Sequence, residues 1–111
     1  TDQNAVSQSF DKGFAAYMLG NYSQAIIEWR HKASFGSATA MANLGNMYEV
    51  GAGVKQDKVL AHQWYNLAAS NGGVVARKNK QNLEKNMTVL QISSARILAK
   101  KCMISGYLDC D

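Results

Sequence analysis

The sequence predicts an all-α fold, a right-handed α-solenoid of about three antiparallel helix hairpins. Proline is absent from its 111 residues, and long alternating runs of β-branched residues are missing, so helix is the expected local structure. The segments around its two tryptophans resemble each other, which indicates an internal repeat. Glycines divide the chain into pieces of hairpin length, at Gly20, Gly36, Gly51, Gly53, Gly72 and Gly73.

Apolar residues at helical spacing predict six helices in a single domain, residues 1–111. The helices are expected at about 5–19, 23–34, 38–50, 58–70, 74–86 and 89–103. They pair into hairpins that cover about 5–35, 38–71 and 74–103, and a tail follows at 104–111.

Each predicted helix has one apolar stripe, whose members recur mainly at three, four or seven residues. In chain order the stripes are Phe10, Phe14, Tyr17 and Met18; Ala25, Ile26, Trp29 and Ala33; Ala40, Leu44, Met47 and Tyr48; Leu60, Ala61, Trp64, Tyr65 and Ala68; Ala76 and Leu83; and Ile92, Ala95, Ile97, Leu98 and Ala99. Two helix starts have clear signals, because Asp57 can cap the fourth helix and Thr88 with Gln91 can form a capping box for the sixth.

The repeat is visible as a shared order of Ala, Trp, Ala, Gly and Ala. Gly36 and Gly72 are 36 residues apart, and so are Ala40 and Ala76. A helix hairpin cannot bury its apolar face alone, and stacked hairpins bury these faces against each other. We therefore expect the tryptophans of both copies in the core, where large rings fill the gaps between helices.

The middle of the chain resembles a known family. Residues 40–57 read Ala-Met-Ala-Asn-Leu-Gly-Asn-Met-Tyr-Glu-Val-Gly-Ala-Gly-Val-Lys-Gln-Asp, and the pattern continues through Ala61, Trp64, Tyr65, Ala68, Ala69 and Gly72. This order is similar to the Sel1-like repeat. The first hairpin resembles a degenerate copy with the shorter tetratricopeptide loop, and residues 74–101 resemble a closing hairpin. The resemblance implies an adaptor or scaffold that binds other proteins, and many bacterial members of this family are exported.

The first helix of each hairpin is expected to line a concave surface that binds a partner protein or peptide. The residues predicted to contact the partner are Phe14, Met18, Asn46, Glu49, Lys78, Asn82 and Lys85. Phe14 and Met18 are apolar and could belong either to the core or to a docking patch. An exported inhibitor or immunity-type protein that blocks a partner enzyme is the alternative. Nucleic acid is not an expected partner, because the net charge of +4 is mild and the basic run at residues 77–85 contains no aromatic residue. The oligomeric state stays open.

An enzyme, such as one acting on cell-wall material, is a weaker hypothesis. The eight acidic residues are scattered, and no nucleophile elbow, metalloprotease helix or phosphate loop occurs. His31 and His62 are expected at the surface or rim, so no metal site and no cofactor are predicted. No apolar run approaches the roughly 20 residues of a membrane span, so membrane insertion is not expected.

Cys102 and Cys110 lie eight residues apart near the end of the chain. They could be free thiols, half of a metal site or a local disulfide, and we favour the disulfide. A disulfide indicates an oxidising compartment, which together with the resemblance predicts a periplasmic or secreted bacterial protein. The tail is expected to cover the apolar face of the last helix with Ile104, Tyr107 and Leu108.

Overall fold

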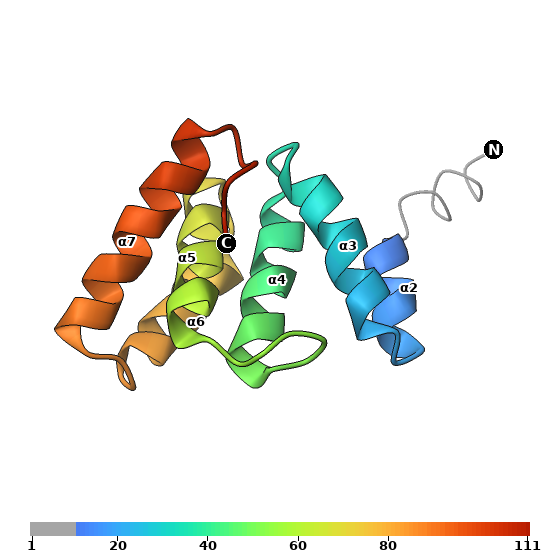
Figure 1. The fold of residues 1–111 in the computed structure, drawn as a ribbon, viewed down its shortest axis with the longest axis horizontal. Coiled ribbons are helices and arrows are strands. Elements are labelled where there is room, and N and C mark those ends of the chain that lie inside the picture. Colours follow the sequence, from blue (N-terminus) through green and yellow to red (C-terminus); the bar gives the residue numbers. More distant parts are fainter. Residues whose placement is uncertain (1–10) are drawn as a thin grey trace.

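The computed structural model describes residues 11–111, which form six helices and no strand (Figure 1). The all-α prediction is therefore confirmed for this part of the chain. The predicted start of the first helix near residue 5, together with Phe10, lies outside the described residues. The helices are α2 (Lys12–Met18), α3 (Tyr22–Ala33), α4 (Ala38–Val50), α5 (Lys58–Ser70), α6 (Val74–Glu84) and α7 (Val89–Ile104).

Each helix packs against the next one along the chain from α2 to α6, and α5 packs against α7 as well. Figure 1 shows the result as a row of helices with α2 at one side and α7 at the other. Helix α5 has neighbours in α4, α6 and α7, so it is covered on more sides than a helix with one partner. Among the described residues, no helix has the length and the apolar character that a bilayer span requires.

Side-chain caps begin four of the helices. The side chains of Asp11, Ser37 and Asp57 accept hydrogen bonds from backbone N–H groups in the first turns of α2, α4 and α5. Thr88 and Gln91 form the predicted capping box of α7, so both start signals in the sequence are confirmed. These caps stabilise helix ends whose N–H groups would otherwise lack partners.

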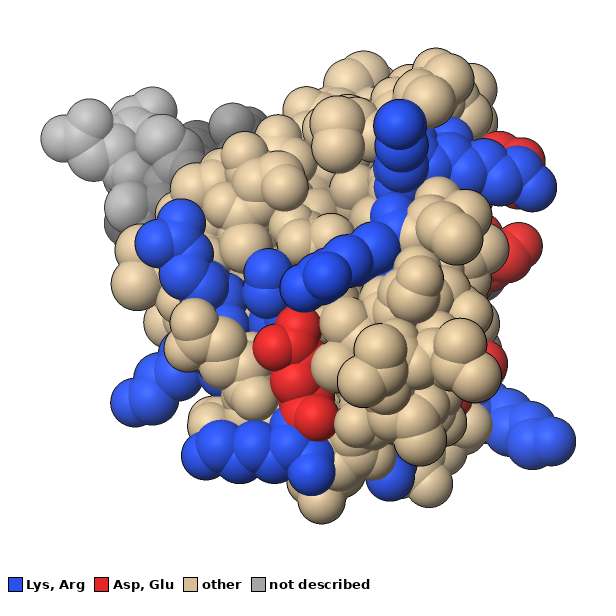
Figure 2. Space-filling view, turned by 90° about the vertical axis from the view of Figure 1, so that its left-hand side faces the viewer, with Lys and Arg blue, Asp and Glu red and all other residues tan. Residues whose placement is uncertain are grey.

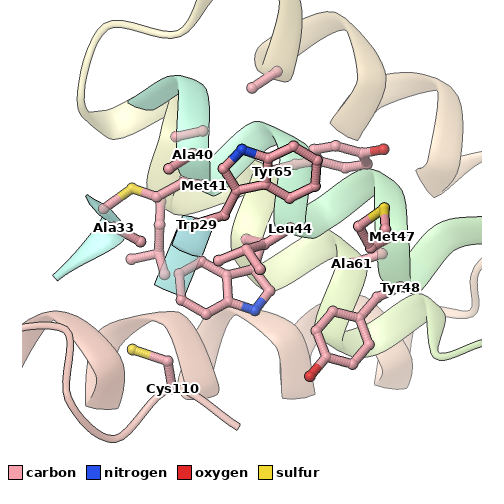
Figure 3. Close-up of a cluster of buried hydrophobic side chains, with 14 of the residues drawn as sticks. Trp29, Ala33, Ala40, Met41, Leu44, Met47, Tyr48, Ala61, Tyr65 and Cys110 are labelled. Carbon is pink, nitrogen blue, oxygen red and sulfur yellow. The ribbon is translucent and has the colours of Figure 1, made fainter. Parts of the chain in front are cut away.

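The core follows the predicted stripes closely in α3 and α4. All four predicted residues are buried in each of these helices, and Trp64 and Tyr65 of α5 are buried as well. Figure 3 shows part of this cluster, with Leu44, Met47 and Ala61 close together. The core position predicted for both tryptophans is confirmed, because Trp29 and Trp64 are each 2% exposed.

The predicted stripe of α2 is buried only in part, and Phe14 and Met18 do not belong to the core. Phe14 is 42% exposed and Met18 is 66% exposed, whereas Gly13 and Ala16 are buried. The reason is the close approach of Trp29, because a Cβ on Gly13 would clash with the indole ring. Gly13 therefore faces α3, the ring of Tyr17 packs beside Trp29, and Phe14 and Met18 are left exposed.

The stripe of α7 also needs a correction. Ile97 was predicted in the core, but it is 66% exposed. Helix α7 packs against α5 with Ala95, Ala99 and Cys102, which are buried. No further helix among the described residues covers its outer side, so Ile97 faces outward.

Candidate interaction surface

The predicted contact residues on α2 and α4 differ in their exposure to solvent. Asn46 and Met18 are exposed, whereas Glu49 is half-buried. The carboxylate of Glu49 accepts a hydrogen bond from the Tyr65 hydroxyl at 2.6 Å. Burial, and then this hydrogen bond to Glu49, raise the pKa of Tyr65. The carboxylate of Glu49 therefore already takes part in the contact between α4 and α5.

The predicted contacts on α6 are all exposed. Lys78 and Asn82 lie on the helix, and Lys85 caps its C-terminal end. These residues are four and three positions apart, so they share one face of the helix. Lys80 points elsewhere, because its ammonium group lies 3.3 Å from Oδ1 of Asn66 on α5.

A cavity of about 420 Å³ lies where the N-terminal ends of α4 and α6 meet. We call it the α4–α6 groove, and it is lined by Ala38, Thr39, Ala42, Asn43 and residues 72–76. Asn46 shares a helix face with Thr39 and Asn43, since the three are four and three residues apart. Val75 similarly shares a face with Lys78 and Asn82. The groove therefore continues along both helices into predicted contact positions.

The residues of this groove were not among the contacts predicted from the sequence. Val74 and Val75 are both exposed, although valine is an ordinary core residue. Ala38 and Ala42, four residues apart on α4, were the available signal, because small side chains at that spacing leave space beside a helix. The spacing alone did not reveal that α6 begins opposite them.

Charged side chains surround the other end of the molecule. Figure 2 shows the face at the α7 side, where several Lys and Arg side chains spread over the surface with acidic side chains among them. On α7 itself Arg96, Lys100 and Lys101 are exposed, and Lys101 pairs with Asp109 at 3.2 Å. The basic character is thus not confined to the predicted contacts on α6.

Comparison with known protein families identifies the central hairpin. Residues 38–73 match the family model of the Sel1 repeat. This segment is a Sel1 repeat. It contains α4, α5 and the turn between them, so the resemblance seen in the sequence is confirmed. A search of curated proteins finds no match to this chain.

Sel1 repeats generally mediate protein–protein interactions and are typically non-catalytic. The repeat forms one wall of the α4–α6 groove through Ala38, Thr39, Ala42 and Asn43, and residues 72 and 73 also belong to it. Within residues 11–111 no group of three or more His, Cys, Asp or Glu side chains is arranged to hold a metal ion.

His62 of the Sel1 repeat is not at the surface, so that prediction is wrong. Its side chain is buried, and Nε2 lies 2.7 Å from the Glu84 carboxylate at the end of α6. The physical reason is that α6 and α7 cover faces of α5 that would be open in an isolated hairpin. His31, by contrast, is exposed as predicted, and its ring contacts that of Phe35.

The Cys102–Cys110 disulfide is present, with Cα atoms 4.4 Å apart, and this prediction is confirmed. The predicted course of the tail is wrong, because Ile104 and Leu108 are 77% and 81% exposed. Cys110 is buried instead at the edge of the core cluster (Figure 3). The tail therefore crosses toward the repeat rather than covering the apolar face of α7.

Asp111 lies in a small polar cluster. Its carboxylate accepts hydrogen bonds from the Arg30 guanidinium on α3 and from the Tyr48 hydroxyl on α4. Burial lowers the pKa of Arg30, but the hydrogen bond and charge of Asp111, with a further contribution from Tyr48, outweigh it and raise that pKa overall. Burial, and then the carboxylate of Asp111, raise the pKa of Tyr48 to about 12.

Proposed function

We propose that the chain is a protein-interaction module that binds a partner protein or peptide along α2, α4 and α6. The observation that carries this proposal is the α4–α6 groove within and beside the Sel1 repeat, a cavity of about 420 Å³ flanked by exposed polar residues. In this reading the three hairpins form a right-handed solenoid, and its first helices line the concave side.

Each predicted contact has a different role in this proposal. Phe14 and Met18 supply apolar area on α2, and Asn46 supplies a hydrogen-bonding group on α4. Lys78, Asn82 and Lys85 supply positive charge and hydrogen bonds on α6. Glu49 acts through Tyr65, which it holds in place at the α4–α5 contact. Rim charges of this kind act mainly on the rate of association.

The experiment is a charge reversal on α6. A partner captured from native extract is measured by surface plasmon resonance against the chain and against Lys78→Glu with Lys85→Glu. The proposal predicts a slower association rate, with a loss that shrinks as salt is added. Lys55→Glu with Lys100→Glu is the matched control, because it makes the same charge change at exposed positions outside the groove. Equal losses in both variants would contradict the proposed site.

We further propose that the chain works in the bacterial periplasm or outside the cell. The disulfide supports this location, because such bonds persist in oxidising compartments. An exported inhibitor or immunity-type role fits the same location and is the second candidate. It predicts that the captured partner is an enzyme whose activity falls when one equivalent of the chain is added, and an unaffected partner activity would leave only the adaptor role.

A further inference from the structure

Residues 107–111 contact the helices in the way a bound peptide would. Gln63 of α5 is completely buried, and its side-chain amide donates a hydrogen bond to the backbone carbonyl of Cys110. The next residue, Asp111, places its carboxylate between Arg30 and Tyr48. One backbone group and one acidic side chain are thus recognised side by side by groups on α3, α4 and α5.

The chemistry of these groups is selective for a carboxylate. A guanidinium and a phenol hydroxyl both donate hydrogen bonds, and charge-assisted bonds of this kind are about twice as strong as neutral ones. An amide side chain in place of the carboxylate would lose the charge and half of the acceptor capacity. Arg30 and Tyr48 also contact each other at 2.6 Å, so the two donors are held in place together.

Two hydrogen-bonding groups of α5 near the tail have no partner in the described part of the chain. Oε1 of Gln63 is buried and has no hydrogen-bond partner among residues 11–111, and the same is true of Nε1 of Trp64. Gln63 and Trp64 are neighbours on α5, and the amide of Gln63 already binds the tail through its nitrogen. A buried acceptor without a partner is costly, and the N–H of a peptide backbone would satisfy it.

There is also room for a longer ligand. A cavity of about 390 Å³ lies beside the tail. Its walls are Arg30, His31 and Ser34 of α3, Trp64 of α5 and residues 107–111.

We propose that this surface on α3, α4 and α5, the tail site, binds a short peptide that carries an acidic side chain, and that residues 107–111 occupy it as an intramolecular ligand. The tail site shares no residue with the α4–α6 groove or with the contacts proposed on α2, α4 and α6. The inference therefore stands independently of the proposed function.

The disulfide determines whether the site is open. A tethered segment acts at a high effective concentration, so the bonded tail excludes a competing peptide. Opening requires a dithiol reductant. The Cys102–Cys110 bond breaks, and each sulfur gains one electron and one proton. The dithiol reductant supplies these two electrons and two protons and forms its own disulfide. In the dithiol form the tail stays attached to α7 through its backbone, but the constraint of the closed loop is lost, so its effective concentration at the site falls.

The test uses the full chain with its tail weakened. Cys102→Ser with Cys110→Ser removes the disulfide and leaves the tail attached only through its backbone, and Asp111→Asn removes the tail's own carboxylate. The probe is the acetylated and amidated peptide Ser-Gly-Tyr-Leu-Asp-Ser-Asp, which has the sequence of residues 105–111 with serine in place of cysteine. The matched control peptide carries asparagine as its last residue. Calorimetry measures both dissociation constants, and circular dichroism verifies that each variant is folded.

We expect the acidic peptide to bind the triple variant at least about tenfold more tightly than the control peptide, a factor that corresponds to about 1.4 kcal/mol. Tyr48→Phe, which keeps the ring, should remove most of that difference, and the disulfide-bonded wild type should not bind. The proposal is overturned if the two peptides bind equally, if the acidic peptide does not bind the triple variant, or if the bonded wild type binds it as well.

Discussion

Gly45 of α4 lies directly against the aromatic ring of Tyr65 on α5. A Cβ built on Gly45 would be 2.6 Å from two ring carbons, which is closer than real Cβ atoms approach other atoms. The ring cannot move away easily, because Tyr65 is 1% exposed and its hydroxyl is bonded to Glu49. The absence of a side chain at position 45 thus sets the spacing of the two helices in the Sel1 repeat.

Gly45→Ala should therefore destabilise the protein, although alanine favours helix by about 1 kcal/mol over glycine. Overpacking of a rigid core costs about 1–3 kcal/mol, and we expect a net loss in this range. Urea denaturation measures it. Asn46→Ala, at the exposed neighbouring position, should leave stability unchanged or slightly higher. A stable Gly45→Ala variant would mean that α4 and α5 can separate at little cost.

Trp64→Ala should lower the free energy of unfolding by about 3–5 kcal/mol, the usual cost of removing a buried indole. Trp64 is among the largest fully buried side chains of the molecule. Phe35→Ala is the control, because Phe35 is 80% exposed and its loss should change stability by less than about 0.5 kcal/mol. Similar melting temperatures for both variants would contradict the packing described above.

The protein should carry its disulfide when it is prepared under oxidising conditions. Its intact mass should be about two units lower than after reduction, and neither cysteine should react with an alkylating reagent before reduction. Cys102→Ser with Cys110→Ser should lower the free energy of unfolding by about 2–3 kcal/mol, since the bond closes a short loop. Two freely alkylated thiols in protein taken from its native compartment would argue against both the bond and export.

Stability should fall in strongly alkaline solution. The pKa of Tyr48 rises from 10.0 to about 12 in the folded chain because of burial and the Asp111 carboxylate, so the neutral phenol is favoured by folding. This contribution is complete below pH 10 and is lost as the pH rises toward 12. Melting temperatures of Tyr48→Phe should consequently decline less over this interval than those of the wild type.

The melting temperature of Tyr48→Phe should still decline at alkaline pH, because the pKa of Tyr65 is also raised by its burial and by its hydrogen bond to Glu49. Tyr48→Phe with Tyr65→Phe should reduce it further. If the melting temperatures of the wild type and both variants declined equally with pH, these two phenols would not be the cause of the alkaline loss of stability.

The periodicity of the sequence was sufficient to predict the helices and most of the core. Apolar residues at helical spacing mark the same stripes in α3 and α4 that the fold buries. The capping box at Thr88 and the pairing of Cys102 with Cys110 are local features, so a short stretch of sequence contains all the necessary information. The Sel1 repeat could be recognised for the same reason, because its residues are contiguous.

The tertiary structure decided which faces were left exposed. Phe14 and Ile97 resemble core residues, but they are exposed because α2 meets α3 through Gly13 and Tyr17, and α7 meets α5 through Ala95, Ala99 and Cys102. His62 resembles a surface residue, but it is buried because α5 has neighbours on three sides.

The course of the tail likewise depended on residues far away in the chain. Asp111 lies at Arg30 and Tyr48, which are 81 and 63 residues distant. Sequence spacing reports neighbours within one helix, where geometry is fixed by the backbone. Contacts between elements depend on how helices stack, and that is set by the shapes and volumes of all the side chains in the interface at once.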